Sequence, residues 1–257
     1  MIGVQAGRLQ AYWDVRAALN FILGGAGAGL MVATLFPFQG KEIPVIVALL
    51  LVAAGLAAVW LEIGRKLRAL HVFFNPFTSW MSRESFCAVL LFVFGGISLF
   101  KIEFLPAASV AALAFLYCQA RLLRAAKGIP AWRAPEVVAL VGSTGLAEGL
   151  GLALLFDSGI LLLGAFALAV LARAFAWTRY RAAVNAPALA GAGTTLLRLG
   201  TFAALGLAAA AWAVPLLAPL AGLAAVAAGW RLKLDLVTRA ALKQEFTLPR
   251  LPVRGTR

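Results

Sequence analysis

Histidine, cysteine and acidic side chains are scarce in this chain of 257 residues. It contains one His, two Cys and ten Asp or Glu, and only 13% of its residues are charged. Soluble domains carry roughly a quarter of their residues as charged side chains, so an ordinary soluble domain is excluded. One His cannot supply both axial ligands of a bis-His haem, and two Cys cannot hold an iron-sulfur cluster. We therefore expect no haem and no metal in this chain.

The two cysteines, Cys87 and Cys118, both fall inside long apolar runs and are not spaced as a C-x-x-C motif. Such residues are usually packed thiols, so we expect neither a disulfide nor a ligand role for them.

Apolar residues make up 63% of the chain, and the mean hydropathy is +0.94. The runs are continuous and rich in Leu and Ala, without the period-two alternation of a membrane β-barrel. The pattern predicts an all-α integral membrane protein, a bundle of about eight transmembrane helices. The last two runs are short, so a count of six or seven stays open. We expect the spans near 17–36, 44–63, 85–101, 104–120, 135–156, 158–177, 199–213 and 215–230.

The basic residues are distributed unequally between the two faces that eight spans would create. Of the 23 Lys and Arg, 21 fall on the face that carries both termini, and only Lys41 and Lys101 fall on the other. By the positive-inside rule, both termini are cytoplasmic. We expect a membrane bundle over 1–232 and a basic cytoplasmic arm over 233–257. The first apolar run is too long for a typical signal peptide, so we expect it to remain as the first helix.

The stretch "RALHVFFNPFTSWMSRES", residues 68–85, is a polar and aromatic island that holds the only histidine. The second helix is predicted to continue through 61–73, which would place Trp60, Gly64, Leu67 and His71 on one face with Arg68 beside the imidazole. His71 would then lie at the cytoplasmic boundary. The plainest interpretation is an interfacial histidine bonded to a backbone carbonyl.

Arg83 and Glu84 follow at the predicted start of the third helix, and two interpretations stay open. They satisfy each other at a helix N-terminus, where a carboxylate is favoured. Alternatively, they form a pocket with His71 and aromatic walls that include Trp80. A quinone needs such a pocket, because its ring packs on aromatic surface and its carbonyl oxygens receive hydrogen bonds and protons on reduction.

Other polar or small residues lie within the predicted spans. The glycines of "GGAGAG", residues 24–29, suggest a close-packing surface at Gly25 and Gly29. Asn20 lies one turn before them and is expected to face the bundle interior, where it binds either a ligand or a neighbouring helix. Glu148 is expected to be protonated, hydrogen-bonded within the bundle, or part of a proton path.

Three stretches resemble the quinone-interacting membrane anchors of complex iron-sulfur molybdoenzymes, of the dimethyl sulfoxide reductase anchor and NrfD-like type. "LHVFFNPFTSWMSRE" is similar to that family's Leu-His motif, aromatic or proline-bearing loop and Ser-x-Glu. "YCQARLLRAAKGIPAWRAPEVVALVGSTGLAEGLGL" is similar to its loop with Pro-x-Trp and its glycine-bearing fifth helix. "YWDVRAALNFILGGAGAG" is similar to its first helix. Together these stretches cover a little over a third of the chain.

The resemblance implies a membrane anchor in the bacterial cytoplasmic (inner) membrane that passes electrons between a partner iron-sulfur subunit and quinone, either ubiquinone, menaquinone or a similar molecule. It implies that His71 and Glu84 line the quinone site and handle the protons, with Arg83, Trp80, Asn20 and Arg68 as further binding candidates. The residue before the acid is cationic here, which leaves the role of Arg83 open.

The partners implied are an iron-sulfur electron-transfer subunit and a molybdopterin catalytic subunit, on the cytoplasmic face because that face is basic. Among relatives, the resemblance is greatest to the small anchor of phenylacetyl-CoA:acceptor oxidoreductase, which implies a role in phenylacetyl-CoA oxidation. A different class of function, a small-solute transporter or a non-catalytic membrane scaffold, is the alternative. Transporters often show internal repeats and polar sites at the bilayer midplane, whereas this polar cluster is expected at an interface.

Overall fold

The computed structural model describes residues 9–10, 13–37, 40–63 and 66–242 and contains, over those residues, helices, turns and one isolated backbone pairing. Seven of its helical segments are long and apolar enough to cross a membrane. The chain is therefore an all-α, multi-pass membrane protein, as its composition predicts.

Most long helices follow the apolar runs, and two of them are interrupted by π-helical turns. The first comprises α1 (Val15–Leu19), a π-helical turn (Asn20–Gly24) and α2 (Gly25–Ala33). The next are α3 (Glu42–Glu62), α4 (Trp80–Ser98), α5 (Leu105–Ala125), α6 (Pro130–Arg133), α7 (Glu136–Ala153) and α8 (Ile160–Ala183). Then come α9 (Ala190–Leu197), a π-helical turn (Arg198–Ala203), α10 (Ala204–Ala210) and α11 (Leu217–Thr238). Short 3₁₀ helices span Lys66–Phe74, Ile102–Phe104 and Pro187–Leu189.

Two of the helix starts are set by capping side chains. Asp14 precedes α1 and accepts a hydrogen bond from the backbone N–H of Arg16 at 2.7 Å. The Arg16 side chain also donates to this carboxylate, which lowers the pKa of Asp14. Ser79 precedes α4, and its hydroxyl accepts from the N–H of Ser82 at 3.4 Å. Both caps satisfy N–H groups that the helix itself leaves without partners.

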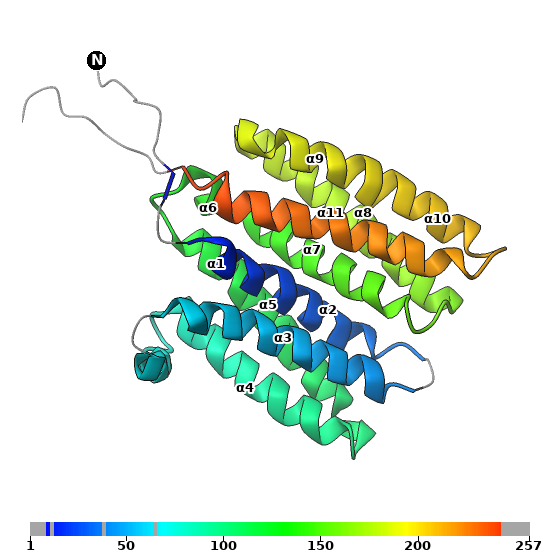
Figure 1. Ribbon diagram of the computed structural model, residues 1–257, viewed down its shortest axis with the longest axis horizontal. Coiled ribbons are helices and arrows are strands. Elements are labelled where there is room, and N and C mark those ends of the chain that lie inside the picture. Colours follow the sequence, from blue (N-terminus) through cyan, green and yellow to red (C-terminus); the bar gives the residue numbers. More distant parts are fainter. Residues whose placement is uncertain (1–8, 11–12, 38–39, 64–65, 243–257) are drawn as a thin grey trace, which may run out of the picture.

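The two ends of the described chain meet at one end of the bundle. Leu9 and Leu242 form an antiparallel bridge, and the N–H of Gln10 donates to the carbonyl oxygen of Ala241 at 2.9 Å. In Figure 1, α1 begins and α11 ends at this same side. The described chain therefore runs along the bundle an even number of times. Seven of its long helices are apolar enough to span a membrane, and α11 is the eighth long helix.

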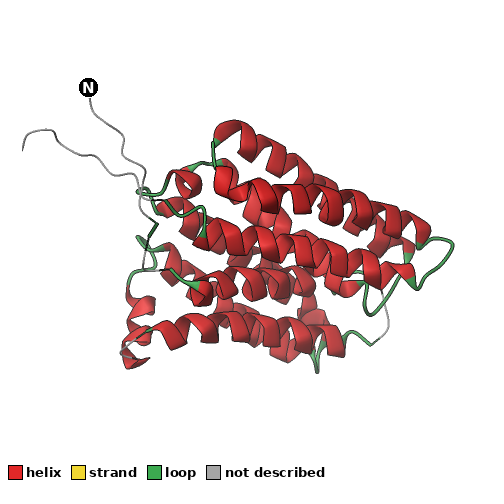
Figure 2. Ribbon diagram, turned by 45° about the horizontal axis from the view of Figure 1, so that its top comes forward, coloured by secondary structure: helices red, strands yellow, loops and turns green. Residues whose placement is uncertain are grey.

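The eight long helices form two neighbouring groups. In both views the helices run roughly along one direction (Figures 1 and 2). In Figure 1, α1 to α5 form one group and α7 to α11 form the other. The groups meet chiefly where α2 packs against α7. The first long helix is mostly buried, whereas α3 and α8 expose large apolar side chains such as Leu50 and Leu168. This distribution is expected for helices that face lipid on their outer side.

Glycines allow the close contact between the two groups. A Cβ atom on Gly29 of α2 would overlap the carbonyl oxygen of Gly145, and one on Gly149 of α7 would overlap the carbonyl carbon of Gly29. The backbones therefore approach as closely as they do in other small-residue helix pairs. The predicted packing role of Gly29 is confirmed. A Cβ atom on Gly25 would instead meet the side chains of Lys233 and Gln119.

The second long helix is shorter than predicted. It ends at Glu62, because Ile63 adopts an extended conformation with ψ of 114°, and the chain resumes as the separate 3₁₀ helix Lys66–Phe74. The continuous helix predicted over 61–73 is therefore wrong. The expected helix face joined Trp60, Gly64, Leu67 and His71. The structure does not describe the side-chain positions at 64 and 67. The break follows the physical change at Glu62, where the apolar run gives way to glycine and basic residues.

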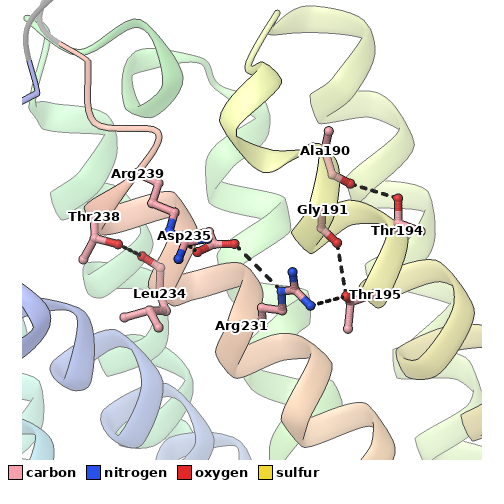
Figure 3. A network of polar contacts seen from close by, with 9 residues as sticks. All are labelled: Ala190, Gly191, Thr194, Thr195, Arg231, Leu234, Asp235, Thr238 and Arg239. Atoms are coloured by element: carbon pink, nitrogen blue, oxygen red, sulfur yellow. Dashed lines mark hydrogen bonds and ion pairs between the residues drawn. The ribbon is translucent and has the colours of Figure 1, made fainter.

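The last two long helices extend beyond the predicted spans. The seventh begins at Ala190 instead of 199, and α11 continues past 230 to Thr238, beyond the expected bundle boundary at 232. The C-terminal extension of α11 makes polar contacts with α9: Arg231 donates a hydrogen bond to the hydroxyl of Thr195 at 2.9 Å (Figure 3). Polar side chains that find partners on a neighbouring helix allow the helix to continue past its apolar run. The remainder of the expected basic arm, 243–257, lies outside the described residues.

We predict that Gly149→Ala or Gly29→Ala lowers stability by roughly 1–3 kcal/mol or more, because the added methyl group meets backbone that cannot move aside. The measurement is the thermal unfolding midpoint of the purified protein in detergent. The matched control is Gly142→Ala on α7, where nothing lies within 4 Å of the added Cβ. Equal midpoints for Gly142→Ala and Gly149→Ala would contradict this account of the α2–α7 contact.

Candidate functional site

A cavity of about 910 Å³ lies between α1, α3, α4 and the 3₁₀ helix Lys66–Phe74, at the end of the bundle where the described chain ends meet. Most of its wall is apolar. Its aromatic lining residues are Trp13, Phe21, Trp60, Phe73 and Phe92. Its polar lining residues are Asn20, Glu62, His71, Asn75, Ser79, Ser82, Glu84 and Ser85. The size and the mixture of apolar wall and few polar groups are those of a site for a small organic molecule.

A buried hydrogen bond joins two walls of this cavity. The side-chain amide of Asn20 donates to Glu84 Oε1 at 2.9 Å, and both residues are less than 5% exposed. Gln119 of α5 donates through Nε2 to the backbone carbonyl oxygen of Asn20 at 2.9 Å. The three residues connect the first helix, α4 and α5. The predicted inward orientation of Asn20 is confirmed, and its partner is the carboxyl group of Glu84.

Backbone geometry brings Asn20 to this position. It is the first residue of the π-helical turn Asn20–Gly24, a local widening that is frequent at functional sites. The α3 backbone passes close by at Gly55, where an added Cβ would lie 3.3 Å from both the Cα and the carbonyl oxygen of Asn20. The neighbouring glycine and the widened turn together allow an amide to reach across to Glu84.

His71 lines the cavity from the 3₁₀ helix, a different wall from the one that the first helix supplies. Its side chain is exposed, and its ring meets the ring of Phe74 edge-on with centroids 5.2 Å apart. Among the described residues the imidazole makes no hydrogen bond, so the expected bond to a backbone carbonyl is not formed there. Both ring nitrogens are therefore available to a molecule in the cavity or to water.

Arg83 and Trp80 lie outside the cavity, in a cationic and aromatic cluster on the surface of α4 and α5. The Arg83 side chain donates to the carbonyl oxygens of Pro76 at 2.8 Å and Phe77 at 2.6 Å. The guanidinium carbons of Arg83 and Arg121 each lie 4.3 Å from the centre of the Trp80 ring. Ring faces attract such cations.

The structure therefore separates the residues that the sequence grouped. His71, Glu84 and Asn20 line one cavity, whereas Arg83 and Trp80 do not line it. The interpretation in which Arg83 and Glu84 satisfy each other is wrong, since each has other partners. The side chain of Arg68 lies outside the part of the chain that the structure describes.

A second buried polar group lies in the other half of the bundle. Lys233 Nζ donates to Glu148 Oε2 at 2.5 Å, and both side chains are at most 2% exposed. Arg173 is fully buried beside them and donates to the carbonyl oxygens of Ala225, at 2.8 Å, and Gly200. Gly200 belongs to the π-helical turn Arg198–Ala203, whose widening exposes its carbonyl group.

Sequence reasoning assigned Lys233 and Arg173 to the basic cytoplasmic face, and that assignment is wrong for both. The sequence feature that indicates a buried cation is Glu148, because a carboxylate buried in a membrane bundle requires a cationic or hydrogen-bonding partner. The expectation that Glu148 is hydrogen-bonded within the bundle is confirmed. Gln119 gave a similar signal, as a single amide inside an apolar run. Pattern alone does not identify which partner each of them finds.

The two cysteines are free thiols whose sulfur atoms lie 4.0 Å apart. This separation is well beyond a disulfide bond length of about 2.05 Å. Cys118 is buried and Cys87 is half-buried, as expected for packed thiols within helices.

Comparison with models of known protein families found no match, and comparison with curated proteins found none either.

We predict that Glu148→Leu lowers stability by about 3–5 kcal/mol, because Lys233 is then left as a buried charge without a counterion. The double variant Glu148→Leu/Lys233→Met removes both charges and is expected to recover most of that loss. Thermal unfolding in detergent measures both. The control is Asp14→Asn, which removes an exposed pair with Arg16 and is expected to leave the midpoint nearly unchanged. A double variant less stable than Glu148→Leu would contradict the pairing.

Proposed function

We propose that this protein is the membrane anchor and quinone-reactive subunit of a molybdenum and iron-sulfur oxidoreductase. Electrons pass between a partner iron-sulfur subunit and membrane quinone at the cavity described above. The observation that carries the proposal is that His71 and Glu84, on separate helical elements, line one aromatic cavity at the end of the bundle.

The residues of the cavity fit a quinone in three respects. Its volume of about 910 Å³ is large enough for a substituted ring and the beginning of an isoprenoid tail. Its aromatic wall offers flat surfaces for ring packing. The buried side-chain oxygen of Asn20, Oδ1, has no hydrogen-bond partner among the described residues, so the site is able to bind an additional donor such as a quinol hydroxyl.

When bound, a quinone accepts two electrons and two protons in its reduction. His71 is placed to hydrogen-bond one carbonyl oxygen from the 3₁₀-helix wall of the cavity, since its ring nitrogens have no described partner. Glu84 is placed to exchange a proton at the inner wall, and Asn20 orients its carboxyl group through the 2.9 Å hydrogen bond. Histidine and glutamate are the side chains best able to exchange protons near neutral pH in such positions.

The charge distribution supports a cytoplasmic orientation for the cavity. Lys41 and Lys101 lie at the ends of α3 and α4 that are remote from the cavity, whereas Arg83 and Arg121 lie on the cavity side. By the positive-inside rule, we infer that this side faces the cytoplasm of a bacterial inner membrane and that all eight long helices cross it. The iron-sulfur and molybdopterin subunits dock there, and the family resemblance suggests phenylacetyl-CoA as their substrate.

A second candidate, a small-solute transporter, is favoured by one observation. Glu148, Lys233 and Arg173 form a charged group deep within the bundle, and ionisable residues inside a membrane often mark a substrate or ion path. The large cavity, however, lies at one end of the bundle, and its wall is mainly apolar and aromatic. Purification from the native membrane separates the two proposals. Copurifying molybdenum and iron support the anchor, and solute uptake by the pure chain in vesicles supports the transporter.

We predict that His71→Ala and Glu84→Gln each lower quinone reduction by the purified complex by at least about 100-fold, the usual contribution of a positioned proton donor. Both variants are expected to retain subunit assembly, because the amide that replaces the Glu84 carboxyl group keeps an oxygen for Asn20, and His71 is exposed. Glu103→Gln, an exposed substitution at the other end of the bundle, is the control. Normal quinone reduction by both site variants would refute the assignment.

A further inference from the structure

Two carboxyl groups line the cavity, and the chemistry proposed so far uses one of them. Glu84 belongs to the inner wall and is only 3% exposed. Glu62 is the last residue of α3, and its side chain is partly exposed. Other lining residues near it in the chain, Trp60 and Leu70, are 43% and 63% exposed. Glu62 therefore lies at the rim of the cavity, where the cavity meets its surroundings.

The inner carboxyl group is able to exchange protons only through the cavity. The polar side chains behind Glu84 are Asn20, which donates to it at 2.9 Å, and Gln119, which donates to the backbone of Asn20. Both are amides, and amides neither release nor take up protons near neutral pH. The thiols of Cys87 and Cys118 do not line the cavity. A proton that Glu84 gives away must therefore be replaced from the cavity side.

The described lining residues offer few groups that could replace that proton. Three of them carry side chains that exchange protons near neutral pH, namely Glu62, His71 and Glu84. In the proposed function, His71 is hydrogen-bonded to a carbonyl oxygen of the quinone. Glu62 is then the group that remains to connect Glu84 with the solvent.

No structural role explains an acid at the position of Glu62. It ends α3, and a helix C-terminus is the end at which a carboxylate is disfavoured. Its side chain makes no hydrogen bond or ion pair with the described residues. Asp14 and Arg16 of the first helix interact with it electrostatically, but they form an ion pair with each other at 2.8 Å and leave no net charge beside it. Glu62 therefore takes up or releases a proton without breaking a contact that holds the fold.

We infer that Glu62 is the proton-entry residue of the quinone cavity, which takes up protons from the solvent at the rim and passes them through water in the cavity to Glu84. When Glu84 gives its proton to a quinone oxygen, an O–H bond breaks on the carboxyl group and another forms on the quinone. The electrons come from the iron-sulfur partner. Glu62 then releases its proton to restore Glu84 and is itself reprotonated from the solvent. This role rests on the proposed function.

The test is the rate of quinone reduction by the purified complex that carries Glu62→Gln. The amide has nearly the same shape but exchanges no proton, so the rate is expected to fall by about tenfold or more. Small weak acids that enter the cavity replace the missing carboxyl group, so added acetate or imidazole is expected to restore most of the rate. Sodium chloride at the same ionic strength is expected to restore none. A purely structural defect would not respond to a weak acid.

Glu42→Gln is the matched control, because Glu42 is an exposed acid at the other end of the same helix. Its rate is expected to equal that of the wild type with or without acetate. Glu62→His keeps a group that exchanges protons near neutral pH and is expected to retain most of the rate. It also provides a second variant if Glu62→Gln does not assemble.

Two results would overturn the inference: a wild-type rate in the assembled Glu62→Gln complex, or a slow rate that neither acetate nor imidazole raises. His71→Ala and Glu84→Gln are measured in the same assay. If those two variants are inactive while Glu62→Gln is normal, the entry residue is wrong and the proposed function stands. If all three reduce quinone at the wild-type rate, the proposed function itself is rejected.

Discussion

The hydrogen bond from Asn20 to Glu84 is the interaction on which the site depends. Within an apolar bundle surrounded by lipid, a carboxyl group has no bulk water to bind, so its partner must come from another helix. The amide reaches Glu84 from the first helix, and Gln119 holds the same turn from α5. Three helices are thereby fixed around one inner wall, and the cavity opens between them and the 3₁₀ helix that carries His71.

Glycines and π-helical turns shape the backbone so that these buried polar groups reach their hydrogen-bond partners. The turn Asn20–Gly24 widens the first helix where Asn20 must reach across, and the turn Arg198–Ala203 presents the Gly200 carbonyl to the buried Arg173. Gly55 admits the α3 backbone beside Asn20. A widened turn therefore appears in both halves of the bundle, each time beside a buried polar side chain. Each widened turn loses regular α-helical hydrogen bonds. This loss is offset because the turn gives hydrogen-bond partners to buried polar side chains, which lipid cannot provide.

Much of the fold was predictable because hydrophobicity over long windows is a strong signal. The all-helical membrane fold, the inward orientation of Asn20 and the packing role of Gly29 all follow from residue type and depth in an apolar run. The end of α3 was not predictable, since one extended residue, Ile63, decides it. Arg83 was expected beside Glu84 but binds elsewhere. Its partners are carbonyl oxygens of the preceding turn, and no pattern of side chains in the sequence predicts such partners. Lys233 was expected on the basic cytoplasmic face because a charged side chain is usually exposed to solvent. It is buried instead, since its counterion Glu148 lies 85 residues away in the chain and the sequence does not reveal that pairing.

The central claim, that the cavity between the first helix, α3, α4 and the 3₁₀ helix receives quinone, is tested most directly by photoaffinity labelling. A quinone that carries a photoreactive azido group is bound to the purified protein, illuminated and located by peptide mapping. The account predicts labelling confined to the cavity-lining stretches 13–21, 56–63 and 69–92 and to Leu122, and displacement of that label by excess unmodified quinone. Label spread over the lipid-facing surfaces of α3 and α8, unaffected by competing quinone, would contradict it.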